Sequence, residues 1–271
     1  MVCPICSSTA CFTFKIKGYP IFKCTGCGHL FLQKDTTINT QNELYADSYF
    51  LGSQDGYSDY DKNKDNLIEQ GHWYADILKK YTVPGYMLDV GAAAGYILKG
   101  FADRGWTGVG LEPNRHMVEI GKKNLRLNMM LGYLETYHST VQFDLISLIQ
   151  VVHHFYDIRL AFEKLQKLTK PQGFLLIESW KIDSLMAFIS GRRWHAFNPP
   201  TVRHWFTVNN LRKLANQFGF EEVQRGRHFK KIKGHLLKDK VFPIFKSLIP
   251  NNMNIHYPGD DLFWILFQKI R

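Results

Sequence analysis

Cysteine is absent from most of this 271-residue chain, because all five cysteines lie within the first 27 residues. This distribution argues against a disulfide framework and favours a metal site near the start of the chain. The chain also lacks an apolar run of about 18 residues, which argues against a transmembrane segment. The first residues show no charged region followed by an apolar stretch, so we expect a cytoplasmic protein.

Acidic residues are outnumbered, since 24 Asp and Glu stand against 34 Lys and Arg and give a formal net charge of +10. Such an excess suits an anionic partner such as RNA or a membrane surface. The excess of basic residues is spread widely along the chain, except that basic residues gather between Arg225 and Lys246. A solvated surface is an equally good interpretation of that cluster. The segment Lys238–Pro250 mixes lysines with apolar residues, so peripheral membrane contact is a hypothesis there, although Pro243 interrupts any long helix and simple packing is favoured.

The chain is long enough, with 45% hydrophobic residues, for one sizeable α/β domain and a small appendage. We expect a zinc-binding ribbon over residues 1–34 and a tyrosine-rich connector with a helix over 35–81. The main domain is expected over 82–271.

Short apolar runs alternate with amphipathic stretches between Tyr86 and Ser179, which predicts βαβ units that build a parallel sheet. Strands are predicted over about 87–90, 107–111, 129–131, 143–149, 174–178, 222–228 and 262–269. Helices are predicted to end near Tyr81, to run from Ile97 to Gly105, to follow an Asn114 cap, to cover 158–169 and to follow a Thr207 cap.

A loop of small residues, LDVGAAAG over 88–95, stands where the first of these strands meets a helix. Such a loop lets the backbone approach a ligand at the helix N-terminus. Glu112 ends the next strand 21 residues after Gly91, where a carboxylate can accept hydrogen bonds from both hydroxyls of a ribose. Tyr96 occupies the place of the third glycine of a dinucleotide fingerprint, which argues against NAD. A helix cap with a surface glutamate is the plainer alternative.

With Asp89-x-Gly91-x-x-x-Gly95 in this place, residues 86–179 resemble the class I S-adenosylmethionine-dependent methyltransferases. The resemblance implies an α/β, Rossmann-like, mostly parallel seven-stranded sheet with S-adenosyl-L-methionine as cofactor. It implies that the loop carrying Asp89, Gly91 and Gly95 passes under the methionine moiety and that Glu112 holds the ribose. It further places Leu134 in the adenine-flanking loop and Gln150 beside the sulfonium, while Ala93 replaces the commoner central glycine.

Two knuckles, Cys3-x-x-Cys6 and Cys24-x-x-Cys27, are separated by 17 residues. This spacing is typical of a structural zinc site that four thiolates close completely. Disulfides or coincidence are the weaker alternatives. Cys11 breaks the pattern, and we expect it to be a buried small hydrophobe.

Zinc knuckles followed by Tyr49-Phe50 and this core resemble a bacterial subfamily of zinc-ribbon methyltransferases that act on small molecules, and the resemblance implies an acceptor of the sugar, lipid-linked or natural-product type. Candidates for acceptor contact or proton removal are His153 and His154 after the fourth strand, followed by His204 and Glu178. The subfamily usually has a Glu-His pair at this point, so His154 is the better supported residue of the two. A histidine that only satisfies a backbone group is the commoner case.

We therefore expect a small-molecule methyltransferase. An RNA methyltransferase is a weaker alternative, because Gln150-Val151-Val152-His153 stands where many nucleic-acid amino methyltransferases carry Asn or Asp before Pro-Pro-aromatic. A non-catalytic zinc-ribbon scaffold that binds the cofactor is the third alternative. The sequence defines neither the acceptor nor the oligomeric state.

Overall fold

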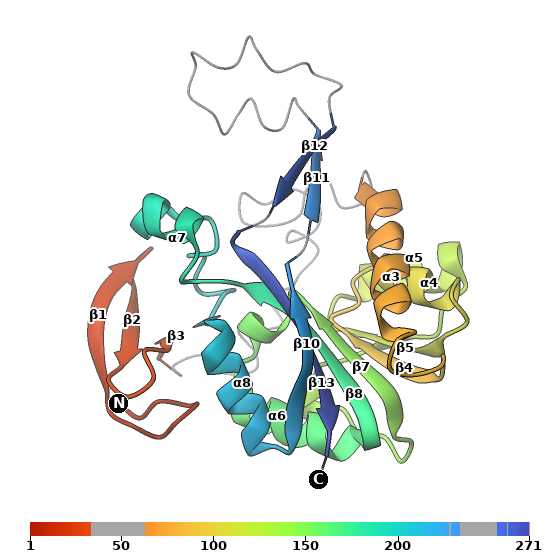
Figure 1. Ribbon diagram of the computed structural model, residues 1–271, viewed down its shortest axis with the longest axis horizontal. Coiled ribbons are helices and arrows are strands. Elements are labelled where there is room, and N and C mark those ends of the chain that lie inside the picture. Colours follow the sequence, from red (N-terminus) through yellow and green to blue (C-terminus); the bar gives the residue numbers. More distant parts are fainter. Residues whose placement is uncertain (34–62, 228, 234–253, 259, 271) are drawn as a thin grey trace.

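The computed structural model describes residues 1–33, 63–227, 229–233, 254–258 and 260–270, and its centre is a seven-stranded sheet (Figure 1). The strand order is β10-β13-β8-β7-β4-β5-β6. The five strands from β8 to β6 are parallel, whereas β13 runs antiparallel to β8 and β10. The strands are β4 (Tyr86–Val90), β5 (Thr107–Glu112), β6 (Met129–Leu131), β7 (Phe143–Ile149), β8 (Thr169–Trp180), β10 (Phe220–Gly226) and β13 (Leu262–Lys269). The expected Rossmann-like, mostly parallel seven-stranded sheet is confirmed.

Helices cover both faces of this sheet, with α3, α4 and α5 on one side and α6 and α8 on the other (Figure 1). Successive strand residues point to opposite faces, so Leu145 joins the cluster under α3 while Ile146 joins the cluster under α6 and α8. This burial on both faces explains why the strands are continuously apolar. The helices are α3 (Lys64–Leu78), α4 (Tyr96–Ala102), α5 (Arg115–Leu125), α6 (Ile158–Leu168) and α8 (Val208–Gln217).

The first residues of the helices lie close to the positions predicted from the sequence. Asn114 caps α5 by accepting from the Met117 amide, and Thr207 caps α8 in a complete capping box. Helix α3 ends at Leu78, before the expected Tyr81. Strand β8 begins at Thr169 rather than Phe174, because Thr169 already pairs with Phe143 and the residues between form a bulge.

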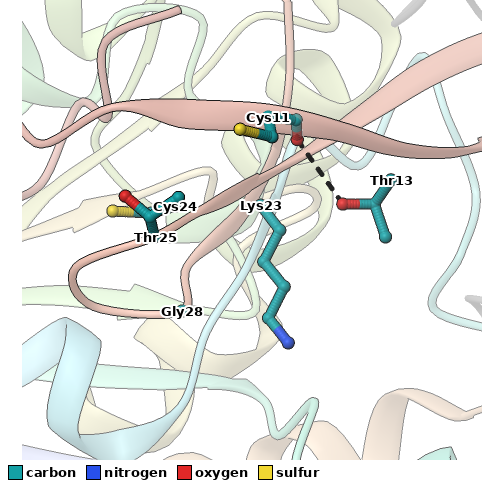
Figure 2. Close-up of a pocket in the computed structure, with 6 residues that line it drawn as sticks. All are labelled: Cys11, Thr13, Lys23, Cys24, Thr25 and Gly28. Atoms are coloured by element: carbon teal, nitrogen blue, oxygen red, sulfur yellow. Dashed lines mark hydrogen bonds between the residues drawn. The ribbon is translucent and has the colours of Figure 1, made fainter.

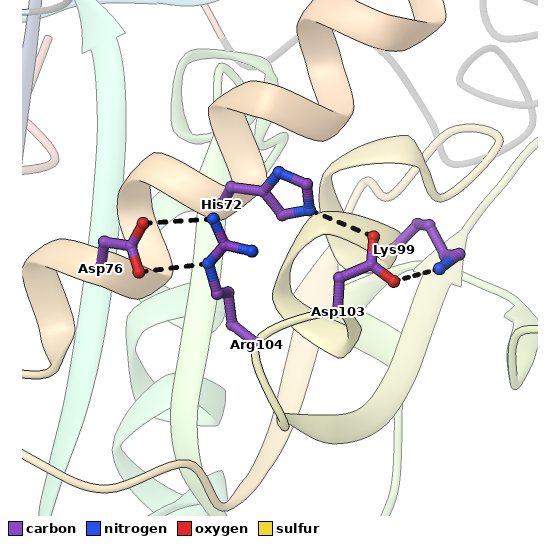
Figure 3. Close-up of polar contacts among 5 residues, drawn as sticks. All are labelled: His72, Asp76, Lys99, Asp103 and Arg104. Carbon is purple, nitrogen blue, oxygen red and sulfur yellow. Dashed lines mark hydrogen bonds and ion pairs between the residues drawn. The ribbon is translucent and has the colours of Figure 1, made fainter.

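Helices α3 and α4 cross at two glycines. A Cβ at Gly71 would lie 2.3 Å from the Ile97 carbonyl oxygen, and one at Gly100 would lie 2.3 Å from the Ile68 carbonyl oxygen. Only glycine therefore permits this backbone contact. A polar network borders the crossing, in which Arg104 contacts Asp76, and Asp103 contacts both His72 and Lys99 (Figure 3).

The N-terminal cysteine module forms a second sheet in the order β1-β2-β3-β9. Its strands are β1 (Ala10–Ile16), β2 (Tyr19–Cys24), β3 (Leu30–Leu32) and β9 (His204–Trp205). The last strand pairs with β3, although it is far from β3 in sequence and lies between the segment of α7 (Leu185–Ser190) and helix α8. Cys11 is exposed, so its expected burial is wrong: Ala10 and Ile16 are the buried residues of β1, and Cys11 lies on the outer side.

A small antiparallel pair, β11 (Phe229–Lys233) and β12 (Asn254–Pro258), projects from the body (Figure 1). The tyrosine-rich connector with Tyr49-Phe50 and the basic segment 238–250 lie outside the described residues. Within the described ranges, no helix has the length and apolar character to cross a membrane.

Candidate functional site

The order of the strands reverses between β4 and β7. From β4 the chain proceeds to β5 and β6 on one side, and from β7 it proceeds to β8 on the other. In open α/β sheets this reversal leaves a crevice at the carboxyl ends of the strands, where ligands bind. The loops after β4, β5, β7 and β8 therefore define the candidate site.

The loop after β4 turns tightly, because Gly91, Ala93 and Gly95 all have positive φ, at 67°, 47° and 82°. A Cβ at Gly91 would approach Val151 Cγ2 to 2.5 Å, so a side chain does not fit there. Gly95 is the N-cap of α4. The loop thus brings backbone, rather than side chains, to the edge of the sheet at a helix N-terminus.

Glu112, at the end of β5, fastens this loop. Its Oε2 accepts from the Ala93 amide and its Oε1 from the Asn114 amide, both at 2.8 Å. Glu112 is 3% exposed, and burial raises the pKa of its carboxyl to about 7. Each carboxylate oxygen retains a further lone pair, so the group can accept two neighbouring hydroxyls.

Asp89 lies near the end of β4 and is buried against β7. Ser147 Oγ donates to Asp89 Oδ1 at 2.7 Å, and the two residues are register partners. Burial raises the pKa of the Asp89 carboxyl to about 7. The Asp89 charge in turn adds to burial in raising the pKa of Glu112.

Leu134 and Gln150 follow β6 and β7. Leu134 is buried on a short 3-10 helix, η2 (Leu134–Thr136). Gln150 has a φ of 59°, its amide donates to the Glu178 carbonyl at 3.0 Å, and its side chain donates to Glu178 Oε1 at 2.9 Å. Gln150 is therefore held in a left-handed conformation between β7 and β8.

Glu178 is the centre of a buried polar cluster at this edge. Tyr74 Oη donates to Glu178 Oε2 at 2.5 Å, and Gln70 Nε2 approaches the same oxygen at 3.3 Å. Burial raises the pKa of the Tyr74 phenol well above its usual value, so the hydroxyl stays protonated and donates. Glu178 was a candidate from its place at a strand end, but its two partners on α3 were not expected. The spacing of Gly71, Tyr74, Ala75 and Leu78 along one helix face would have placed Tyr74 inside.

His153 and His154 lie on a 3-10 helix, η3 (Val152–His154), that follows Gln150. His154 Nδ1 lies 2.6 Å from the Thr201 carbonyl oxygen. Because a carbonyl only accepts, Nδ1 carries the proton and the lone pair is at Nε2. Burial lowers the pKa of His154 to about 4, so its imidazole is neutral near pH 7. His153 is buried beside it, with 4.2 Å between the ring centroids.

His204, on β9, uses both ring nitrogens in contacts within the protein. Its Nε2 lies 3.2 Å from the Phe155 carbonyl and donates to it, so Nδ1 accepts from His29 Nε2 at 3.2 Å. Burial lowers the pKa of His204 to about 3. His204 thus joins the cysteine module to the loop that carries His154.

The four knuckle cysteines converge, with their sulfur atoms within 4.8 Å of one another. The Cys3 and Cys27 sulfurs are 3.7 Å apart, and those of Cys6 and Cys24 are 3.4 Å apart. A tetrahedron with ~2.3 Å zinc–sulfur bonds has edges of about 3.8 Å, so the cluster fits this ion. Amides of Ile5, Gly26 and Cys27 point at the sulfurs of Cys3 and Cys24, as suits thiolate ligands.

A shallow pocket of about 340 Å³ lies on the cysteine module (Figure 2). It is distinct from the candidate site at the carboxyl edge of the seven-stranded sheet. Its lining comes from β1, β2 and the second knuckle, and includes the exposed Cys11 and the Lys23 side chain. None of the candidate cofactor or histidine residues lines it.

The fold and the loops at its carboxyl edge define a doubly wound α/β protein with a glycine-containing turn at the switch point of the sheet. Comparison with known families shows which family of α/β proteins the chain belongs to. Residues 62–225 match a family described as a methyltransferase domain, and the chain belongs to this family of S-adenosylmethionine-dependent enzymes.

Solved structures agree with this assignment. The N-methyltransferase NodS of Bradyrhizobium japonicum WM9, in complex with S-adenosyl-L-homocysteine, superposes with a TM-score of 0.54 at 14% identity over 86% of this chain and 98% of its own. Magnesium protoporphyrin IX methyltransferase of Synechocystis PCC 6803, with S-adenosylhomocysteine bound, gives 0.52 at 12% identity over 76% and 83%. At this identity the likeness shows the fold. None of the curated proteins compared matches the chain in sequence.

Proposed function

We propose that this methyltransferase transfers the methyl group of S-adenosylmethionine to a small-molecule acceptor bound at the carboxyl ends of β7 and β8. The observation that carries the proposal is the position of His154, four residues after Gln150 on one short loop, with a neutral ring and a lone pair at Nε2. Such a group accepts a proton from an acceptor hydroxyl or amine during transfer.

The cofactor would lie over the loop after β4. Gly91, Ala93 and Gly95 would expose backbone to its methionine part, and the Asp89 carboxyl, bonded to Ser147 on β7, would lie at the start of that loop. Glu112 would accept the ribose hydroxyls, since its carboxylate is already oriented by two amides. Leu134 would border the adenine, and Gln150 would lie nearest the sulfonium.

The three histidines contribute differently. His154 is the proposed base, and His153 packs against its ring. The contacts of His204 with Phe155 and His29 favour a role in positioning this loop. Zinc in the four-cysteine cluster would be structural, because four sulfurs leave no open coordination position.

The test is formation of S-adenosylhomocysteine from S-adenosylmethionine with panels of sugars, lipid-linked sugars, amines and RNA. We expect turnover with a small molecule, and a loss of about a hundredfold or more in turnover for His154→Gln with S-adenosylhomocysteine affinity retained. The matched control is His195→Gln, because the His195 side chain is 49% exposed and should be dispensable. Methylation of RNA alone, or full activity of His154→Gln, would contradict the proposal.

A further inference from the structure

A short helix of this protein presents an apolar face to solvent. On α7 (Leu185–Ser190), Leu185, Phe188 and Ile189 are 64%, 84% and 72% exposed. Their spacing of three and four residues places them on one face of the helix. Single exposed apolar residues are ordinary, but three large neighbours form a contiguous patch that marks an interaction site.

The patch is held firmly in this orientation. Ser184 Oγ accepts from the Ala187 amide at 3.0 Å, and Asp260 Oδ2 accepts from the Leu185 amide at 2.6 Å. Ala187, on the opposite side of the helix, is buried in a cluster with Trp194 and Trp205. The fold therefore fixes which side of α7 faces outward.

Basic residues follow the apolar face directly. Arg192 and Arg193 are exposed on the 3-10 helix η4 (Gly191–Arg193). The Arg192 guanidinium lies 5.1 Å from the centre of the Phe14 ring, which ties this segment to β1. We call Leu185, Phe188, Ile189, Arg192 and Arg193 the α7 surface.

The tip of the β1–β2 hairpin extends the α7 surface, and Figure 1 shows α7 beside this end of the hairpin. Lys17 is exposed there and donates to Asn198 Oδ1 at 2.7 Å. Tyr19 is 40% exposed. Apolar side chains, an aromatic residue and cations on one side are the composition of segments that lie in a membrane interface.

We propose that the α7 surface docks onto an anionic lipid membrane, with the three apolar side chains among the acyl chains and the two arginines at the headgroups. Charge complementarity favours this occupant, because arginine pairs with lipid phosphate and the whole chain carries a net charge of +10. A nucleic acid would use the cations but not three large apolar side chains. The proposal is independent of the methyl acceptor.

The test is co-sedimentation of the full chain with phosphatidylcholine vesicles and with vesicles of equal parts phosphatidylcholine and phosphatidylglycerol. We expect binding to the anionic vesicles. Phe188→Glu/Ile189→Glu should weaken it at least about tenfold, because two inserted side chains are lost. Arg192→Gln/Arg193→Gln should weaken it about tenfold and reduce its salt dependence. Val83→Glu is the matched control, since Val83 is 78% exposed but outside the α7 surface.

Unchanged melting temperatures and S-adenosylhomocysteine affinities would show that the variants are folded. The proposal is overturned if the parent does not bind anionic vesicles, or if Phe188→Glu/Ile189→Glu binds them as well as the parent does. It is also overturned if light scattering without lipid shows a stable dimer that this double variant dissociates, because a second copy would then cover the face.

Discussion

At the residue scale, two buried carboxyls set the electrostatics at the carboxyl edge of the sheet. Asp89 and Glu112 are each 3% exposed, and burial raises both pKa values to about 7. A carboxyl with a raised pKa binds more protons in the folded state than in the unfolded state. These two residues therefore lower the free energy of unfolding as the pH rises from about 4 to about 7. Such a cost is typical of groups retained for binding or catalysis.

The affinity for S-adenosylhomocysteine should rise with pH. In its proposed role, an ionised Glu112 would accept ribose hydroxyls better than the acid would, so we expect the gain between about pH 6 and pH 8, with a midpoint near 7. Glu112→Gln should bind at least about tenfold more weakly at pH 8 and lose most of this pH dependence. Calorimetry at several pH values is the measurement, and Asp89→Asn is the control for the second carboxyl. Equal pH profiles for the parent and Glu112→Gln would refute this role.

The role of residues that act through their backbone conformation could be predicted from the sequence. Side-chain hydrogen bonds between residues far apart in the chain could not. Gly91 and Gly95 adopt the left-handed φ that a tight turn requires, and that requirement is visible in residue type. The Tyr74–Glu178 and His29–His204 bonds join positions 104 and 175 residues apart. Nothing local in the chain specifies such partners.

At the element scale, α3 is positioned for the site by its crossing with α4. The contact of Gly71 with Gly100 brings the two backbones together, and α3 then carries Gln70 and Tyr74 to Glu178. The surrounding ion pairs are partly exposed, so they contribute little to stability. The glycines are the decisive residues of this contact.

Gly100→Val should therefore destabilise the protein strongly. Its side chain would meet the Ile68 carbonyl oxygen, and we expect a loss of about 3 kcal/mol in the free energy of unfolding. Lys99→Ala is the neighbouring control, because it removes only the contact with Asp103 and should cost less than about 1 kcal/mol. Denaturant titration measures both variants. Similar small losses for the two would show that the helices do not need this close approach.

Strand and helix positions were largely predictable because apolar periodicity and caps are local signals. Asn114 and Thr207 were identified as caps from residue type, and both accept the expected amide. The early start of β8 was missed, because its bulge around Gln172 depends on pairing with β7. Register between strands is a tertiary property.

At the scale of the whole molecule, the cysteine module and the methyltransferase core share one hydrophobic cluster. Cys3, Ile5 and Phe31 belong to the same buried cluster as Phe206 and Leu211. Asn210 Nδ2 donates to the Cys27 carbonyl at 2.8 Å, which ties α8 to the second knuckle. The boundary of the cysteine module at residue 34 remains a prediction. The pairing of β9 with β3 could not be predicted, because β9 has only two residues and is far from β3 in sequence.

Loss of the four-cysteine cluster should consequently destabilise the whole chain. Cys24→Ser should lower the free energy of unfolding by about 3 kcal/mol or more, and scanning calorimetry should show one transition for module and core together. Cys11→Ser is the matched control, since Cys11 is exposed and outside the cluster. Elemental analysis should find about one zinc per chain in the parent and in Cys11→Ser. Two separate transitions, with the later one unaffected by Cys24→Ser, would show instead that the core is independent.

The most direct test of the central claim, a cofactor site at the carboxyl edge of the sheet, is calorimetric titration with S-adenosylmethionine and S-adenosylhomocysteine. We predict micromolar binding of both compounds by the parent, strong loss in folded Gly91→Arg and Glu112→Ala variants, and no binding of NAD. Absence of binding by the folded parent, or undiminished binding by both variants, would contradict the claim.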